Sequence, residues 1–267
     1  MRIWVASLIF YGFVFAVCEI LRFLIMAIFP PKLLRTQLLL EFVGTLQICT
    51  PMFDVGTVMD AYGIWGVFIE ITVIEIANCC LMRDAVANPC PLVTACYRKG
   101  KALRRALYVF LVQMAAAFLS FHLARFFWTF EVHPKHTELL EDDELCTSDL
   151  TVALTVGCLV EGLATFVAKW FEKWSGEQFG ESWSGSIAGS VFSGFICALG
   201  ITYTGMYANP IVAWACTFNC LGVSHLGHLI VYWLAPLFGW YLAEKSFGYE
   251  EDDYEEEVPV SEEKKKE

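Results

Sequence analysis

Two Asn-Pro dipeptides lie inside apolar sequence, as Asn88-Pro89-Cys90 and Asn209-Pro210-Ile211. Asn is a favourable helix N-cap, and Pro fits the first helical position because its missing N–H has no partner there. Within a membrane, an open helix start is costly unless it faces a water-filled path. Each Asn amide can also donate hydrogen bonds to a passing solute. The two motifs therefore indicate a pair of polar helix starts that line a pore, one in each half of the chain.

The composition indicates a membrane protein. Of the 267 residues 57% are hydrophobic, and the mean hydropathy is +0.54, which is too apolar for an ordinary soluble domain. The net charge of −11 is concentrated in residues 131–149 and 249–267, and the rest of the chain is close to neutral. This distribution gives no indication of nucleic-acid binding.

The hydrophobic pattern predicts an all-α membrane protein with six transmembrane helices and two half-helices, plus an additional N-terminal hydrophobic helix. A half-helix is expected because the apolar stretch after each Asn-Pro covers only about half a bilayer. The full spans are expected at residues 3–29, 37–56, 61–82, 102–128, 150–171, 183–203 and 227–247. The predicted organisation is an extra membrane helix at 1–29, a first repeat at 37–128 with a half-helix at 88–97, an acidic loop at 129–149, a second repeat at 150–247 with a half-helix at 209–220, and a disordered acidic tail at 248–267.

The two halves share a second motif. Glu41 and Thr45 recur as Glu161 and Thr165 at an offset of 120, and the Asn-Pro pairs recur at an offset of 121. Agreement of both motif and spacing indicates an internal repeat. Each repeat holds three full spans, so the second copy is inverted in the membrane, as is typical of transport proteins. The positive N-terminal ends of the half-helices are then expected to meet near the midplane, where they disfavour protons and cations.

Lys and Arg predict the orientation. Ten of them fall on one face and three on the other, so the first face is expected to be cytosolic, together with the C-terminal tail. The N-terminal segment either spans the membrane or lies in its interface. Lys264 and Lys265 stand at the fourth and third positions from the end, which looks like a dilysine retrieval signal for the endoplasmic reticulum.

The doubled Asn-Pro and Glu-x-x-x-Thr motifs resemble the aquaporin (major intrinsic protein) family over roughly residues 37–247. Further matches are Gln113 and the stretch Val231-Tyr232-Trp233-Leu234-Ala235-Pro236. Cys90, Phe42 and the extra N-terminal segment are similar to the unorthodox branch that holds aquaporins eleven and twelve. The resemblance implies a passive channel for water and small neutral solutes such as glycerol or hydrogen peroxide, without enzyme activity or cofactor. It also implies a homotetramer in the lipid bilayer of the endoplasmic reticulum or another intracellular membrane.

The resemblance also implies roles for individual residues. Glu41 and Glu161 are expected to support the half-helix loops by accepting hydrogen bonds from backbone amides. A selectivity filter is expected, by spacing, at Phe68, Cys197, Met206 and Val212. Val212 stands where the family commonly has an Arg that repels cations, and Cys90 and Ile211 replace the usual Ala after each Asn-Pro. The expected filter therefore has almost no hydrogen-bonding capacity.

An alternative function is a non-conducting membrane scaffold of the same fold, since Met206 and Ile211 are bulky. Glu70 and Glu75 are predicted either to line the pore or to lie near an interface. His225 and His228 lie one turn apart but have no evident third ligand, so no metal site is predicted.

Two other classes of protein fit poorly. A seven-span receptor would have its Asn-Pro in the last span, whereas another whole span follows Asn209. An intramembrane enzyme would need a nucleophile with its base, or a metal site.

Cys146, in the acidic loop, could form a disulfide if that loop faces an oxidising compartment.

Overall fold

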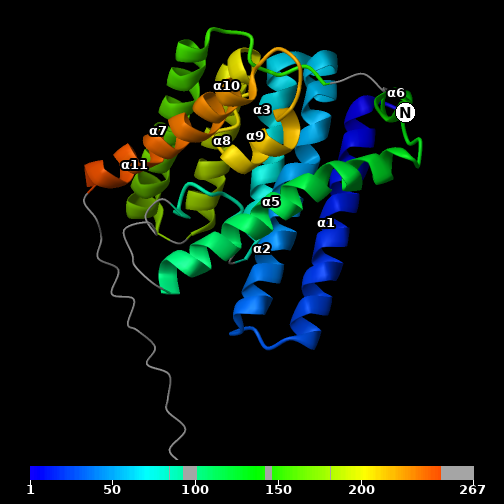
Figure 1. Cartoon of the computed structure of the whole chain (residues 1–267). Helices are drawn as coiled ribbons and strands as arrows, with labels where there is room; N and C mark the ends of the chain where they lie inside the picture. The colour runs from blue at the N-terminus through cyan, green and yellow to red at the C-terminus, as the bar shows by residue number, and fades with distance from the viewer. Residues whose placement is uncertain (84, 93–100, 142–145, 181, 248–267) are drawn as a thin grey trace, which may run out of the picture.

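The computed structural model describes residues 1–83, 85–92, 101–141, 146–180 and 182–247 as a bundle of helices (Figure 1). The helices are α1 (Ile3–Ile28), α2 (Leu34–Cys49), α3 (Val55–Leu81), α5 (Lys101–Trp128), α6 (Pro134–Glu141), α7 (Leu154–Phe179), α8 (Trp183–Thr204), α9 (Pro210–Thr217), α10 (His225–Leu229) and α11 (Ala235–Phe247). A 3₁₀ turn, η1 (Thr50–Asp54), joins α2 to α3, and a π-helical turn, η2 (Ile230–Leu234), joins α10 to α11. Six of the described helical stretches are long and apolar enough to cross a membrane, so the fold is an all-α membrane fold.

One of these six stretches, Leu34–Leu81, contains a reversal of the chain. Gly63 has φ 65° and ψ −161°, a conformation that is essentially restricted to glycine. Asp54 and Glu70 both accept a hydrogen bond from the Tyr11 hydroxyl. Along one straight helix these two residues would lie about 24 Å apart. The chain therefore turns back at Gly63, and the turn that the spacing of spans predicted at residues 57–60 lies slightly later.

Close helix crossings depend on glycine at two places. A Cβ atom on Gly239 of α11 would overlap the carbonyl oxygen of Gly162 in α7. On α8, a Cβ atom on Gly194 would lie 2.8 Å from the carbonyl oxygen of Phe68 in α3. Helices that carry small residues at such positions can approach closely within a membrane. These contacts bring α11 close to α7 and α8 close to α3.

The N-terminal helix α1 is packed into the bundle. Phe10, Val14 and Cys18 on its inner face are fully buried, in one cluster with residues of α2 and α5. The acidic loop contains a helix, α6, that the sequence pattern did not predict. His136 on α6 is buried, and its Nε2 lies 3.3 Å from Oδ1 of Asp54. A helix of eight residues carries too short a pattern to be recognised in a charged segment.

The second half-helix is α9, which begins at Pro210 with Asn209 as its N-cap. The first half-helix, predicted at 88–97, is described only to Leu92, and residues 93–97 lie outside the described residues. The tail predicted at 248–267 also lies outside them.

Candidate functional site: two half-helix loops between two cavities

Glu41 on α2 holds the loop that leads to Asn88. Its Oε2 accepts a hydrogen bond from the backbone N–H of Val86 at 2.9 Å, and its Oε1 accepts one from Ala87 at 2.7 Å. The Gln113 side chain of α5 donates to the same Oε1 at 2.7 Å. The carboxyl group is buried, and these three donors satisfy it away from water.

Glu161 on α7 makes the equivalent contacts in the second half. Its Oε1 accepts from the Tyr207 N–H at 3.1 Å and the Thr204 hydroxyl at 2.6 Å, and its Oε2 accepts from the Ala208 N–H at 2.8 Å. The residues bound by the two carboxyls are 121 positions apart, which is also the offset of the Asn-Pro pairs. Each half of the chain therefore fixes its loop in the same way.

The residue before each Asn adopts an unusual backbone conformation. Ala87 has φ 48° and Ala208 has φ 47°, in the left-handed region that L-residues other than Gly, Asn and Asp rarely occupy. Such a conformation costs about 1–2 kcal/mol per residue. The hydrogen bonds from the Ala87 and Ala208 N–H groups to the two carboxyls stabilise it. This feature could not be read from the sequence, since Ala does not favour a positive φ.

Both Asn side chains cap the turn that follows them. Oδ1 of Asn88 accepts from the Cys90 N–H at 2.9 Å, and Oδ1 of Asn209 accepts from the Ile211 N–H at 3.1 Å. Nδ2 of Asn209 donates to the carbonyl oxygen of Ala87 at 2.9 Å, which joins the two loops directly. The two motifs, 121 residues apart in sequence, therefore lie side by side.

Two cavities border the two loops. The Asn88 cavity has a volume of about 550 Å³ and the Asn209 cavity about 630 Å³. Each is named here for the Asn in its wall. The Asn88 cavity is otherwise rich in small polar groups, among them Thr165, Ser186, Ser190 and Ser193. Four residues line both cavities: Glu75, Ala168, Ser193 and Ala208. The two cavities therefore share part of their lining, including Ala208 of the second Asn-Pro loop.

Comparison with known proteins finds relatives among aquaporins. No family model matches the chain. An aquaporin-11 of the tardigrade Milnesium tardigradum is 21% identical over 87% of this chain and 83% of its own length. A putative aquaporin-10 of Caenorhabditis elegans is 24% identical over 88% of this chain and 83% of its own length. An aquaporin-11 of the horse, Equus caballus, is 23% identical over 75% of this chain and 73% of its own length.

The chain is similar to these aquaporins over most of its length.

Of the four predicted filter residues, the structure brings three together. Cys197, Met206 and Val212 all line the Asn209 cavity. Phe68 instead packs edge-on against Trp65 one turn away on α3, with ring centroids 6.1 Å apart, and Ile71 of the same helix lines the cavity. The assignments of Phe68 and Cys197 both depend on a gap-free spacing in the sequence. Phe68 and Ile71 are both apolar, so the prediction of a filter with little hydrogen-bonding capacity is the same for either residue.

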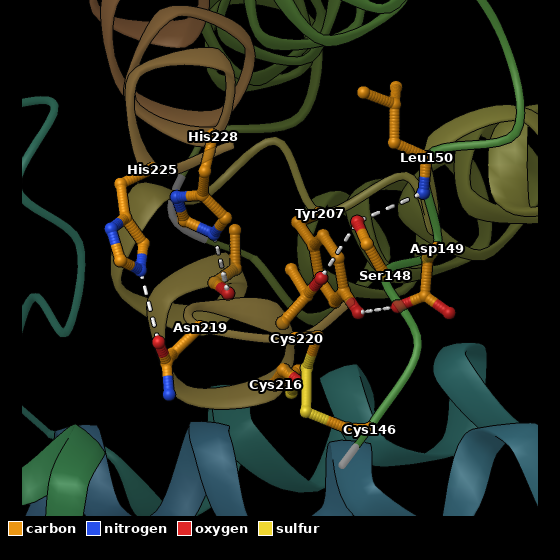
Figure 2. Close-up of a disulfide and its surroundings, with 12 residues drawn as sticks. Cys146, Ser148, Asp149, Leu150, Tyr207, Cys216, Asn219, Cys220, His225 and His228 are labelled. Carbon is orange, nitrogen blue, oxygen red and sulfur yellow. Dashed lines mark hydrogen bonds between the residues drawn. A yellow bond between two sulfur atoms is a disulfide. The ribbon is translucent and has the colours of Figure 1, made fainter. Parts of the chain in front are cut away.

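A disulfide lies close to residues that line the Asn209 cavity, among them Asp149, Tyr207 and Cys216 (Figure 2). Cys146 is bonded to Cys220, just beyond α9, and the Leu221 N–H donates to the Cys146 carbonyl at 2.7 Å. Beside it, the Tyr207 hydroxyl donates to the carboxyl of Asp149, and both residues line the cavity. The sequence suggested that Cys146 could pair but gave no way to choose its partner among the other ten Cys.

The remaining predicted polar residues separate in the structure. Glu75 lines both cavities, whereas Glu70 is bound to Tyr11 of α1. His225 lies 3.0 Å from the side-chain oxygen of Asn219, and His228 is directed to a backbone carbonyl (Figure 2). The two His side chains thus have separate partners.

Proposed function

We propose that this aquaporin-family chain is a passive membrane channel for water and small neutral solutes such as glycerol and hydrogen peroxide. The observation that carries the proposal is the pair of cavities that meet at the joined Asn-Pro loops, with Asn88 in the wall of one and Asn209 in the wall of the other. Both Asn side chains are only partly buried, so they remain accessible from the cavities.

The two amides would act as donors at the centre of the path. An Asn side chain has two amide hydrogens. In Asn209 one of them is directed to the Ala87 carbonyl, which leaves the other for a solute oxygen. A water that accepts this bond is turned away from its neighbours, and this interrupts a chain along which protons could hop. No covalent step is needed, so the channel requires no enzyme activity.

The two buried carboxyls would serve as structural supports. Glu41 and Glu161 bind backbone N–H groups on the loops, and their position behind the loops keeps the Asn amides directed inward. Cys197, Met206 and Val212 would form an apolar filter in the outer part of the path. A filter without the Arg that is common in this family is expected to discriminate solutes by size more than by hydrogen bonding.

The cellular setting is proposed from the sequence. We propose a homotetramer in the endoplasmic reticulum or another intracellular membrane, with a cytosolic C-terminus. Lys264 and Lys265, which would engage retrieval machinery, lie outside the described residues. An endoplasmic reticulum lumen or another oxidising compartment would suit the disulfide between Cys146 and Cys220.

The test is osmotic shrinkage of proteoliposomes that contain the purified full chain. A channel makes them shrink faster than protein-free vesicles when an impermeant solute is added, and glycerol or hydrogen peroxide uptake is measured in the same preparation. If neither water nor a small neutral solute passes faster than through protein-free vesicles, the channel proposal is wrong. That result would instead support the non-conducting scaffold, with Met206 as the residue to examine for a block.

A further inference from the structure

Glu75 is the one ionisable residue that lines both cavities among the residues that the structure describes. It lies on α3, well inside a membrane-spanning helix. A carboxyl group at that depth is costly, and such residues usually face a water-filled cavity and act there. A purely structural carboxyl would be buried behind the loops, as Glu41 and Glu161 are. Glu75 instead occupies the wall of the path at its junction.

The charges around the Asn209 cavity all have one sign. Its described lining includes the carboxyl groups of Asp60, Glu75 and Asp149 and contains no Lys, Arg or His. Val212, in the first turn of α9, lies in the same wall and is uncharged. A cleft lined by one sign of charge concentrates ions of the opposite sign. This cavity should therefore attract cations.

The Asn88 cavity contains one described cationic side chain, and that side chain is engaged. Nζ of Lys169 lies 3.2 Å from a carboxyl oxygen of Glu172 and 4.4 Å from the centre of the Trp240 ring. Lys169 therefore adds little net positive charge to the path. The remaining positive potential comes from the N-terminus of α9 and from that of the half-helix expected at 88–97, about half an elementary charge each. A single carboxyl at the junction, when it is ionised, offsets both of them.

We propose that Glu75 sets the charge selectivity of this channel, so that the path admits small monovalent cations as well as neutral solutes. The inference rests on the proposed channel function and goes beyond it, because the two half-helix ends alone would disfavour cations. The carboxyl of Glu75 removes that barrier at the narrow junction. The carboxyl-lined Asn209 cavity supplies cations to it.

The experiment compares potassium influx with water flux in vesicles of neutral phosphatidylcholine that contain the full chain. Influx is read with an enclosed potassium-sensitive dye, and water flux by osmotic shrinkage of the same vesicles. The variants are Glu75→Gln, Glu75→Asp and, as a matched control, Glu70→Gln. Glu70 lies on the same helix but is bound to Tyr11, away from both cavities. A single elution peak and the melting temperature check that each variant is folded.

The wild-type chain should raise potassium influx above that of protein-free vesicles. Glu75→Gln should lower the ratio of potassium to water flux at least tenfold, whereas Glu75→Asp and Glu70→Gln should keep a ratio close to that of the wild type. Water flux without potassium influx in the wild type overturns the inference and leaves the channel proposal intact. So does a wild-type ratio in folded Glu75→Gln. A wild-type chain that passes neither water nor potassium contradicts both proposals.

Discussion

Replacing Glu161 by Ala should destabilise the second Asn-Pro loop strongly. Glu161 is fully buried, and its carboxyl accepts the N–H groups of Tyr207 and Ala208 and the hydroxyl of Thr204. The hydroxyl can rotate to another acceptor, but the two N–H groups cannot. Each buried donor left without a partner costs about 1–3 kcal/mol, which gives a loss of about 2–6 kcal/mol.

The loss can be followed by thermal unfolding of the purified chain in detergent. For a domain of about this size each kcal/mol shifts the melting temperature by about 2–4 °C, so a decrease of roughly 4–24 °C is expected. Glu161→Gln keeps one acceptor oxygen and presents an amide NH₂ to the other donor, so about half of this decrease is expected. Glu177→Ala, at an exposed position on the same helix, is the control.

The first repeat offers an independent check. Glu41 accepts two backbone N–H groups in the same way, so Glu41→Ala should produce a decrease of similar size. If Glu161→Ala lowers the melting temperature no more than Glu177→Ala does, the carboxyl does not hold the loop, and the proposed supporting role of both Glu residues is wrong.

Three further predictions concern helix packing, the disulfide and pH. Gly239→Ala forces α11 away from α7 and should lower the unfolding free energy by about 1–3 kcal/mol. Gly12→Ala is the control, because a Cβ atom at Gly12 meets nothing within 4 Å and should leave the stability unchanged. Equal melting temperatures of the two variants would contradict the close crossing of α11 and α7. Cys146→Ser removes the disulfide to Cys220, which closes a loop with a sequence separation of 74, and should lower the unfolding free energy by about 4 kcal/mol. A variant as stable as the oxidised wild type would refute this prediction. Desolvation raises the pKa of Asp149, partly offset by the hydrogen bond from Tyr207. The folded chain thus holds this proton more tightly than the unfolded chain, so the stabilisation is full below the ordinary pKa of about 3.9 and is lost as pH rises through the raised pKa. Asp149→Asn should therefore flatten the dependence of melting temperature on pH above the ordinary carboxyl pKa, and an unchanged slope would contradict the assignment.

The fold class could be predicted from the sequence because its main signals are long-range and regular. Apolar runs of bilayer length indicated the spanning helices, and the all-α membrane fold is confirmed. The shared offsets of the Glu-x-x-x-Thr and Asn-Pro motifs indicated the family, which the comparisons support. The pore roles of Asn88 and Asn209 stay a prediction, although the structure brings the two loops into contact.

Features that depend on local geometry were harder to predict. The sequence placed a turn near residues 57–60, but only the backbone of Gly63 allows the conformation at which the chain reverses. The eight residues of α6 gave no clear periodicity among charged neighbours. The partner of Cys146 could not be chosen, since disulfide connectivity is not determined by spacing.

The position of Glu75 was undecided for a similar reason. Glu70 and Glu75 are five residues apart on one helix, and the sequence does not say which face meets a cavity. In the structure the first is bound to α1 and the second lies in both cavity walls. The packing of α3 against α1 and α8 determines which of the two carboxyl groups lines the cavities. This packing cannot be read from the sequence of α3 alone.

The most direct test of the central claim is osmotic water permeability in proteoliposomes, for the wild-type chain and for Asn209→Asp. The wild type should shrink several-fold faster than protein-free vesicles. Asn209→Asp removes both amide hydrogens, including the one donated to Ala87, so the permeability in excess of protein-free vesicles should fall at least tenfold. Equal permeability of the folded variant and the wild type would contradict the claim that the joined Asn-Pro loops form the centre of a conducting path.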